Sequence, residues 1–262
     1  MNRQARETRQ FGTPELAFQL ARPFLKVRRP MAPTIAQPNF RNIILAGLSA
    51  NTVKSLSLTA LDIAVNDPVY GANEPFSTVY FPESGLISIV STLENGKSIE
   101  VGMFGREGIS SSELLLGAKS SPFRCFAQVA GTGFRTSVQR FVDAVSADAH
   151  FREKILQFDN SSRVQSMQGL ACNALHTIEQ RCCRWLLMVH DRVALDDLRL
   201  SHEFLAMMLG VRRASVTEVL LPLQELALVR STRGTISILN RKRLEERACE
   251  CYWLIRNFGT LN

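Results

Sequence analysis

A glycine between two short helical patterns places the tightest constraint on the fold of this chain. Ser201 is a favourable helix N-cap, and the apolar pattern after it predicts a helix over His202–Leu209. Gly210 can adopt the left-handed conformation that ends a helix, and a second helix is expected to begin near Arg212. The segment therefore predicts two short helices that meet at a sharp turn.

The residues at the expected crossing have the sizes that two steeply crossed helices need. Ala206 permits a close approach, and the branched side chain of Val216 can fill the shared core. Two extended runs around Thr232-Arg233-Gly234 then predict a β-hairpin. This order of elements indicates a winged helix-turn-helix: a capped helix, a glycine turn, a helix with a basic start and a hairpin.

In a winged helix-turn-helix, the start of the second helix enters the major groove of DNA. Arginine can donate two hydrogen bonds to guanine there. Phosphate contacts are expected at the start of the first helix, where backbone amides point outward, and at the hairpin tip. The base-contacting candidates are Arg212, Arg213, Ser215 and Thr217, and the backbone-contacting candidates are Ser201, His202 and Arg233.

Proline at position 222 interrupts the second helical pattern. It removes a hydrogen bond to the carbonyl of Glu218 and clashes with that turn. We therefore expect the second helix to be kinked at Pro222 or to end close to it. The DNA-contacting end lies more than two turns away and should keep its geometry.

The segment before Ser137 has β texture. Two alternating runs, Leu86–Leu93 and Ser98–Met103, flank Asn95-Gly96 and predict a hairpin with a primed turn, which needs positive φ at both central residues. The stretch Phe123–Phe134 predicts a further strand, turn and strand. Many short strands without intervening helices predict an antiparallel jelly roll or barrel, so the fold class is α+β.

Helical texture returns from about Val138 to Arg192, where the chain has no proline and a single glycine. Apolar spacing predicts a short helix that leads into a long one. A long helix between two domains often packs against its copy, so we expect a homodimer, with a plain core helix as the alternative. The expected domains are a basic extension (1–38), a sensor domain (39–146), a connecting and dimerisation helix (147–193) and a winged helix-turn-helix (194–262).

The positive charge of the chain is concentrated at its N-terminus. The net charge is +7, and residues 1–30 hold seven basic and two acidic side chains. The other residues therefore contribute an excess of only two positive charges, so a basic surface on the folded part must be local. The arginine- and proline-rich extension is expected to be disordered, and Met31 is an alternative start.

The cysteines do not follow a known metal-binding spacing. No two of them form a C-x-x-C pair, and their spacing fits no zinc module, so no metal site is predicted. No apolar run reaches the roughly 20 residues of a membrane span, and no secretory signal is present. We therefore expect a cytoplasmic chain without a membrane partner, whose cysteines are free thiols. The six cysteines are Cys125, Cys172, Cys182, Cys183, Cys249 and Cys251.

The stretch "LSHEFLAMMLGVRRASVTEVLLPLQELALV" resembles the winged helix-turn-helix of the Crp–Fnr superfamily of bacterial transcription regulators. The likeness covers about residues 40–255. It implies a cyclic-nucleotide-binding-like jelly roll as sensor, dimerisation through the long helix, double-stranded DNA as partner, and RNA polymerase as a further partner. Arg213 matches the base-contacting arginine of the family. Ala214 and Glu218 stand where members often have Glu and Arg, which implies a different DNA half-site.

The sensor segment departs from the pattern of cyclic-nucleotide binders. In "SSSELLLGAKSSPFRCF" the glutamate is kept as Glu113, but the phosphate-binding arginine is missing, although Arg124 is near. These two residues are the candidates for an effector pocket, and we expect an unknown small molecule there instead of a cyclic nucleotide. The first 124 residues contain no cysteine, so neither an Fnr-type iron–sulfur cluster nor another cofactor is expected.

Two other classes of function remain open. The same fold could be a protein-interaction module that does not bind DNA, and such binding would depend less steeply on salt concentration. Carboxylates of the β-rich segment, Glu100, Glu107 and Glu113, could do acid–base chemistry. That segment has no histidine and one cysteine, and no nucleophile motif is present, so we do not expect an enzyme.

Overall fold

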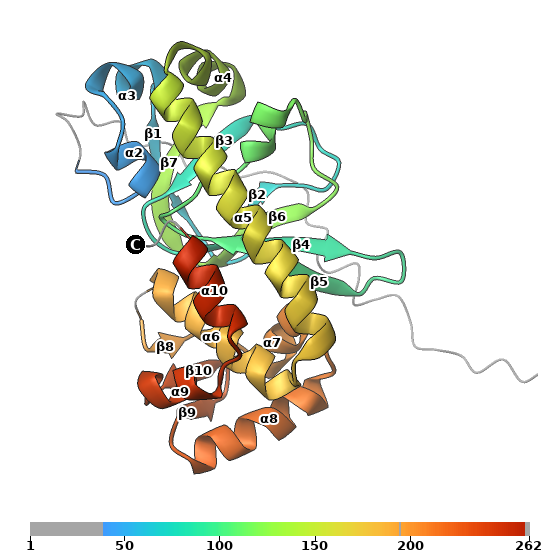
Figure 1. Ribbon diagram of the computed structural model, residues 1–262. Helices are drawn as coiled ribbons and strands as arrows, with labels where there is room; N and C mark the ends of the chain where they lie inside the picture. Colours follow the sequence, from blue (N-terminus) through green and yellow to red (C-terminus); the bar gives the residue numbers. More distant parts are fainter. Residues whose placement is uncertain (1–38, 194, 260–262) are drawn as a thin grey trace, which may run out of the picture.

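A computed structural model describes residues 39–193 and 195–259 of the chain, so the predicted extension 1–38 lies outside the described residues. Two antiparallel sheets and four short helical segments make up its N-terminal part (Figure 1). One sheet has the strand order β1-β7-β3 and the other β2-β6-β4-β5. The antiparallel prediction is confirmed, with the sheets open and not closed into a barrel. The strands are β1 (Thr59–Ile63), β2 (Pro68–Tyr70), β3 (Thr78–Pro82), β4 (Leu86–Thr92), β5 (Ser98–Phe104), β6 (Arg124–Val129) and β7 (Gly131–Ser137).

The β4–β5 hairpin forms as predicted, but its turn differs from the expected one. Leu93 N donates to Lys97 O at 2.8 Å, so three residues, Glu94 to Gly96, form the loop. Only Gly96 has a positive φ, of 77°. Asn95 instead accepts a hydrogen bond from Lys97 N at 3.0 Å. The expectation of a primed two-residue turn was wrong, because three-residue loops need the left-handed conformation at one position only.

The chain changes sheets between β6 and β7, where a strand, turn and strand were predicted. β6 pairs with β2 and β4, whereas β7 pairs with β1 and β3. Gly131 stands at the crossing, where a Cβ atom would lie 2.1 Å from the carbonyl oxygen of Ser84. The backbones approach too closely there for any side chain, which explains the glycine.

The predicted long helix over 147–193 is two helices. Asp148 caps α5 (Ala149–Leu175) by accepting a hydrogen bond from Phe151 N at 3.1 Å. After His176, the hydroxyl of Thr177 accepts from Gln180 N at 3.3 Å, and α6 (Ile178–Val193) begins. The cap at Thr177 stops one helix and starts the next, because a capping hydroxyl favours a non-helical backbone at its own residue. The preceding helices are α2 (Ile43–Ala46), α3 (Ala50–Leu56), η1 (Ser112–Leu116) and α4 (Val138–Ala147).

The C-terminal part combines a helix pair with a small sheet of order β8-β10-β9. α7 (His202–Leu209) has the predicted bounds, and the predicted hairpin is β9 (Val229–Thr232) with β10 (Thr235–Ile238). The sequence reasoning did not include the third strand, β8 (Asp197–Leu198), or the two helices after the hairpin. The remaining elements are α8 (Arg213–Glu225), α9 (Arg241–Arg247) and α10 (Cys251–Phe258).

α8 continues through Pro222 and ends at Glu225, less than one turn later. The missing N–H of proline leaves the Glu218 carbonyl without its helical bond. The amide of Leu226 then donates to Pro222 O at 3.1 Å and closes the last turn. The predicted end close to Pro222 is therefore confirmed to within one turn, and the first two turns of α8 are unaffected.

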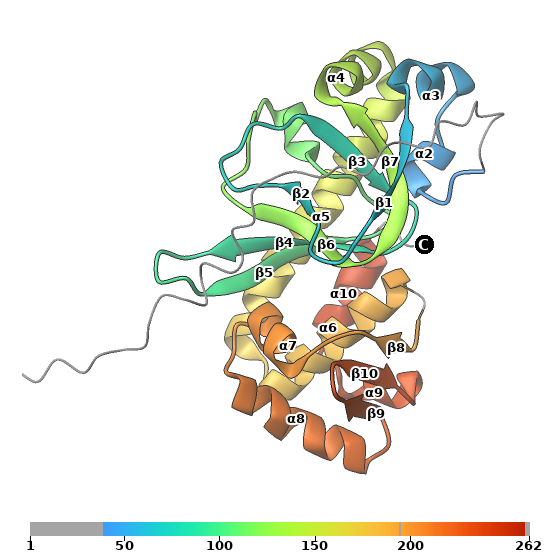
Figure 2. The same ribbon diagram turned by 180° about the vertical axis from the view of Figure 1, so that it is seen from behind.

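Two apolar cores hold these parts. One lies inside the N-terminal sheets and extends to α4 and α5. The other joins α6 to the helix pair and the small sheet, and it includes Leu86, Val90, Met103 and Phe126 of the N-terminal sheet. The two parts therefore share buried surface, and α5 and the β4–β5 hairpin lie along their junction (Figure 2). In residues 39–193 and 195–259, no helix is long and apolar enough to cross a membrane.

Candidate nucleic-acid interface

The turn between α7 and α8 has the geometry that the sequence predicted. Ser201 caps α7 by accepting a hydrogen bond from Phe204 N at 3.1 Å. Gly210 ends the helix at φ 65°, in the left-handed region. Ala206 and Val216 are both buried between the helices. A small residue, a permissive turn and a branched apolar residue thus set the crossing of the two helices.

The start of α8 is basic, exposed and without a side-chain cap. Arg212 occupies the N-cap position and makes no side-chain cap bond, although Ser, Thr, Asp or Asn would be usual there. Arg212 and Arg213 are both exposed, and Ser215 is half-buried. The first amides of a helix lack intrahelical partners, so this end offers backbone N–H donors beside two guanidinium groups. Such a surface is suited to an anionic polymer.

His202 joins three elements of the domain. Its Nδ1 lies 3.1 Å from Thr217 Oγ1 of α8, and its Nε2 lies 2.7 Å from Ser231 Oγ of β9. Burial, with the nearby Arg213 charge as a second cause, lowers the pKa of His202 below its ordinary value. A neutral ring therefore uses both nitrogens inside the protein. His202 fixes α8 against the wing in this conformation and presents no unpaired ring nitrogen to a phosphate.

Thr217 is also held within the protein. Besides the contact with His202, its hydroxyl donates to the carbonyl of Arg213 at 3.3 Å. The side chain is exposed, so its methyl group remains accessible. Of the predicted base-contacting set, Arg212 and Arg213 have freely exposed polar ends, whereas the hydroxyl of Thr217 is already bonded.

The wing places further positive charge next to α8. Arg233 is exposed at the tip of the β9–β10 hairpin, where Gly234 adopts a φ of 77°. Arg230 is exposed on β9, and the sequence reasoning did not single it out. A basic side chain within the first strand of the predicted hairpin was the signal that could have identified it.

The β4–β5 hairpin of the N-terminal part lies against this domain. Ile99 of β5 packs on Gly210, where an added Cβ would come within 2.6 Å of Ile99 Cδ1. Trp185 of α6 donates its Nε1 hydrogen to Glu100 of β5, and Arg181 donates to the carbonyl of Leu209. The hairpin, α6 and the end of α7 are therefore in direct contact. A shift of the hairpin would consequently displace the turn that precedes α8.

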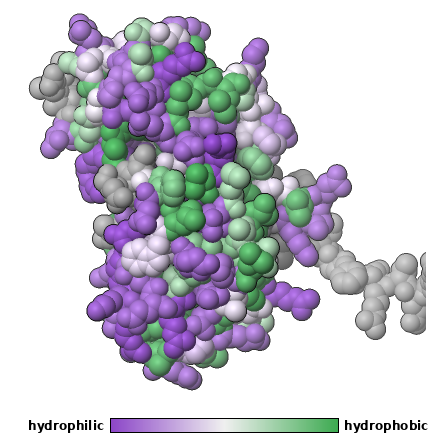
Figure 3. Space-filling view, viewed as in Figure 1, coloured by the Kyte–Doolittle hydropathy of each residue, from purple (hydrophilic) through white to green (hydrophobic). Residues whose placement is uncertain are grey.

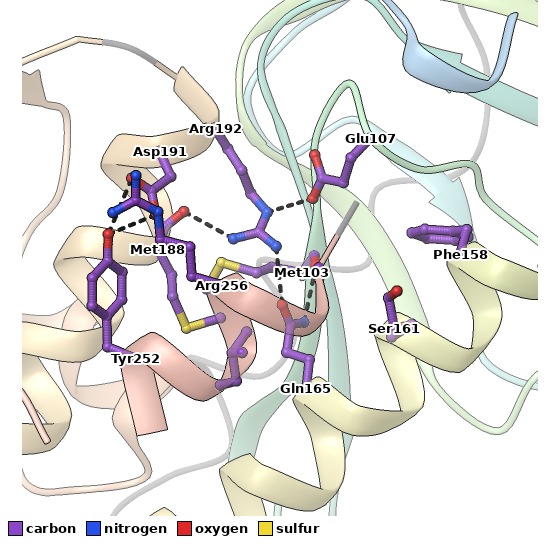
Figure 4. Close-up of a pocket in the computed structure, with 13 residues that line it drawn as sticks. Met103, Glu107, Phe158, Ser161, Gln165, Met188, Asp191, Arg192, Tyr252 and Arg256 are labelled. Atoms are coloured by element: carbon purple, nitrogen blue, oxygen red, sulfur yellow. Dashed lines mark hydrogen bonds and ion pairs between the residues drawn. The ribbon is translucent and has the colours of Figure 1, made fainter. Parts of the chain in front are cut away.

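A buried ion pair holds the same junction. Arg192 Nε of α6 lies 2.6 Å from Glu107 Oε1, with both side chains more than nine-tenths buried. The other end of the Arg192 guanidinium donates to Gln165 of α5, which in turn donates to the carbonyl of Met103 (Figure 4). These bonds link the N-terminal sheet, α5 and α6 in one network. Glu107, one of the three carboxylates considered for acid–base chemistry, is thus part of this structural network.

A cavity of about 340 Å³ lies between the N-terminal sheet and α5. Of the two predicted effector residues, Glu113 lines it and Arg124 does not. Arg124 instead stacks on the Phe126 ring at 4.5 Å. Burial raises the pKa of Glu113, and Asp159 of α5 contributes in the same direction. The cavity is therefore lined by two carboxyl groups, Glu113 and Asp159, and by one arginine, Arg163.

Sequence reasoning predicted no metal site, but the fold brings four possible ligands together. Cys172, His176, Cys249 and Cys251 have ligand atoms that all lie within 4.8 Å of one another. The available signals were C-x₃-H at the end of a predicted helix and C-x-C near the C-terminus. Each is weak alone, and more than 70 residues separate them. The other cysteines, Cys125, Cys182 and Cys183, are buried and free, as expected.

Comparison with known proteins supports the helix-turn-helix directly. The profile of the Crp-like helix-turn-helix domain matches residues 180–247, which begin in α6 and end with α9. No match was found among curated protein sequences.

Several solved structures share the fold of most of this chain. FixK2 from Bradyrhizobium japonicum is 17% identical and aligns with a TM-score of 0.61, covering 73% of this chain and 98% of that one. A putative transcriptional regulator of the Crp/Fnr family from Eubacterium rectale is 17% identical, with a TM-score of 0.63, covering 82% and 98%. The c-di-GMP responsive regulator CLP from Xanthomonas campestris is 19% identical, with a TM-score of 0.61, covering 72% and 99%.

At these identities the solved structures establish the fold, and the domain profile establishes the kind of helix-turn-helix. With 73% and 82% of this chain aligned, the shared fold extends well beyond residues 180–247. The chain thus carries a Crp-like helix-turn-helix domain on a fold that it shares with solved regulators of the Crp/Fnr type, which supports its role as a DNA-binding transcription regulator.

Proposed function

We propose that the chain binds an operator as a homodimer, with the start of α8 in the major groove. The observation that supports this most is the exposed, uncapped Arg212-Arg213 end of α8 beside the wing. Arg213 donates to guanine, and Arg212 and Ser215 contact neighbouring bases or phosphates. Thr217 contributes its methyl group, because its hydroxyl is bonded within the protein.

The backbone contacts are shared between the start of α7 and the wing tip. Ser201 uses its oxygen as the cap of α7, and its hydroxyl hydrogen is left for a phosphate. Arg233 reaches a second phosphate from the hairpin tip. His202 acts here as a positioning residue, since both of its nitrogens bond to Thr217 and Ser231. It contacts a phosphate only if DNA binding breaks one of these bonds.

A second copy of the chain is the proposed partner of α5. Met167, Leu170 and Leu175, all in the second half of α5, are 65%, 74% and 80% exposed. Figure 3 shows hydrophobic surface along the lower half of α5 as it runs in Figure 1. A cluster of exposed apolar side chains on a helix marks a surface for association with another protein chain. A two-fold symmetric dimer would present two copies of α8, one to each half-site of a DNA operator.

The sensor part would control this arrangement through the β4–β5 hairpin. The 340 Å³ cavity is lined by Ile89, Val101 and Gly102 of that hairpin and by Asp159 and Arg163 of α5, so a small molecule bound there would contact both elements. The hairpin in turn contacts Gly210 and α6. Differential binding to two hairpin positions would therefore bias the orientation of α8. The two carboxyl groups favour an uncharged or cationic effector over an anionic one.

The decisive experiment is selection of bound DNA from a random-sequence pool by the full chain, followed by sequencing. We expect a palindrome whose half-sites lie about one helical turn apart, because the dimer is symmetric. The affinity for that palindrome should fall steeply with salt, since phosphate contacts release counterions. No enriched sequence, or binding that is insensitive to salt, would favour the protein-interaction alternative.

A further inference from the structure

Four side chains with metal-ligating atoms meet where α5 ends and α10 begins. Cys172 lies in the last turn of α5, and His176 is its C-cap residue. Cys249 follows α9, and Cys251 is the first residue of α10. The three cysteines are buried and form a cluster separate from both apolar cores. Neither the DNA interface nor the effector cavity uses any of them.

The separations within this Cys/His cluster match those around one tetrahedral ion. Cys172 Sγ lies 3.4 Å from Cys249 Sγ, and Cys251 Sγ lies 3.5 Å from His176 Nδ1. Zinc bonds of about 2.3 Å to sulfur and about 2.0 Å to nitrogen place tetrahedral ligands roughly 3.5–3.8 Å apart. All four atoms lie within 4.8 Å of one another, so they can surround a single ion with little movement. A binuclear iron–sulfur cluster needs its two ligand pairs further apart.

Neighbouring polar side chains hold two of the ligands by hydrogen bonds, as such side chains do around known metal sites. His176 presents Nδ1 to the cluster, and its Nε2 lies 3.3 Å from the Glu250 carboxylate. A carboxylate on the second ring nitrogen fixes the tautomer that leaves Nδ1 free to bind metal. Gln168 donates its amide to Cys251 Sγ at 3.0 Å, which favours a thiolate there.

Two buried arginines supply positive charge that can compensate the negative charge of a metal–thiolate centre. Arg181 and Arg184 of α6 are buried, and neither forms an ion pair with a carboxylate in residues 39–193 and 195–259. The Nε atom of each also lacks a hydrogen-bond partner in the described residues. Three thiolates, one neutral histidine and one Zn²⁺ carry a net single negative charge, which one such guanidinium group is enough to balance.

We propose that Cys172, His176, Cys249 and Cys251 bind one Zn²⁺ ion in a closed Cys₃His structural site. The ion ties the segment before α10 to the end of α5, at the break between α5 and α6. α10 packs along both of these helices, as Figure 1 shows. Residues 250–258 lie beyond the matched helix-turn-helix domain, so the site fixes a C-terminal segment that the domain itself does not include. This inference does not depend on the proposed DNA contacts.

The first test measures zinc in the full-length chain purified under reducing conditions. We expect one equivalent of zinc per chain, retained on gel filtration and released when the thiols are modified with a mercurial. Cys249→Ala and Cys251→Ala should lose the ion, whereas Cys125→Ala and Cys182→Ala, which remove buried thiols outside the cluster, should keep it. A wild-type chain that stays free of zinc after incubation with Zn²⁺ and reductant would overturn the proposal.

A second measurement covers the case in which the alanine variants do not fold. Co²⁺ in place of zinc should give the strong visible bands and the thiolate charge-transfer band of a tetrahedral site. His176→Cys keeps four ligands, so it should still bind Co²⁺, with its bands shifted to longer wavelength. Weak bands typical of six-coordinate Co²⁺, or an intact mass showing a Cys172–Cys249 disulfide in the reduced preparation, would contradict the zinc site.

Discussion

The start of α8 and the junction of β5, α5 and α6 use charged side chains in opposite ways. At α8, Arg212 and Arg213 are exposed and the helix has no side-chain cap. At the junction, Glu107 and Arg192 are buried and bonded to each other at 2.6 Å. An exposed charge keeps its hydration and its freedom to meet a partner, whereas a buried pair is costly to separate. The first region is thus suited to recognition, and the second to fixing how the two parts of the chain sit together.

The largest effect is expected at the buried ion pair. Glu107→Ala leaves the Arg192 charge without its partner and removes the acceptor of the Gly105 amide, so stability should fall by about 3–5 kcal/mol. Urea unfolding would measure it, with Glu94→Ala at the exposed hairpin tip as the control. If Glu107→Ala changed the preferred DNA sequence and left the unfolding midpoint in place, the division between the two regions would be wrong.

Glu100 provides a pH-dependent test of the same junction. Burial raises its pKa to about 7, against hydrogen bonds from Ser88 and Trp185 and the charges of Arg184 and Arg192. Because the folded state holds this proton more tightly than the unfolded state, stability from Glu100 is present below its unfolded pKa of 4.5 and is lost as the pH rises to about 7. The loss should be on the order of 3 kcal/mol.

Glu100→Gln keeps a hydrogen-bonding side chain without the titration. The difference in unfolding free energy between the wild type and this variant should therefore decrease from pH 4.5 to pH 7 and be constant above that. Denaturant melts at several pH values would measure this difference. A difference that does not change with pH would show that Glu100 is not desolvated in solution.

At α8 the expected change is in recognition and not in stability. Arg213→Ala should lower discrimination for the selected operator by about 1–3 kcal/mol, or roughly five- to 150-fold, with little change in the unfolding midpoint. Arg140→Ala, an exposed arginine on α4, is the matched control. Competition binding against a scrambled duplex measures the effect. An unchanged ratio between operator and scrambled DNA would remove Arg213 from the base-contacting set.

The smallest effect is expected at Ser201, a single residue that serves both protein stability and DNA recognition. Ser201 caps α7, so Ser201→Ala should cost about 1 kcal/mol of stability, and it should also weaken DNA binding through a lost phosphate contact. Ser137→Ala is the counterpart, since Ser137 caps α4 and lies in the N-terminal part, away from the proposed DNA interface. Thermal melts and mobility shifts should show similar stability losses and a binding loss for Ser201→Ala only. Equal DNA affinities for the two variants would limit Ser201 to its capping role.

Local signals accounted for much of the winged domain. Ser201, Gly210 and the Thr232–Gly234 turn set the bounds of α7 and the wing because capping and positive φ depend on a few neighbouring residues. The hairpin strands β4 and β5 were found for the same reason. The turn between them was misjudged because two- and three-residue loops share the Asn-Gly signal, and cross-strand pairing selects between them.

The sequence by itself determined the order of the parts, the helix-turn-helix and the basic end of α8, since these depend on residues close together in the chain. The tertiary structure alone decided the break at Thr177, the bonding of His202 to Ser231 and the burial of Glu107 against Arg192. It also brought Cys172 and His176 to Cys249 and Cys251. Ligand geometry and desolvation depend on which surfaces pack together, and spacing along the chain does not encode that packing.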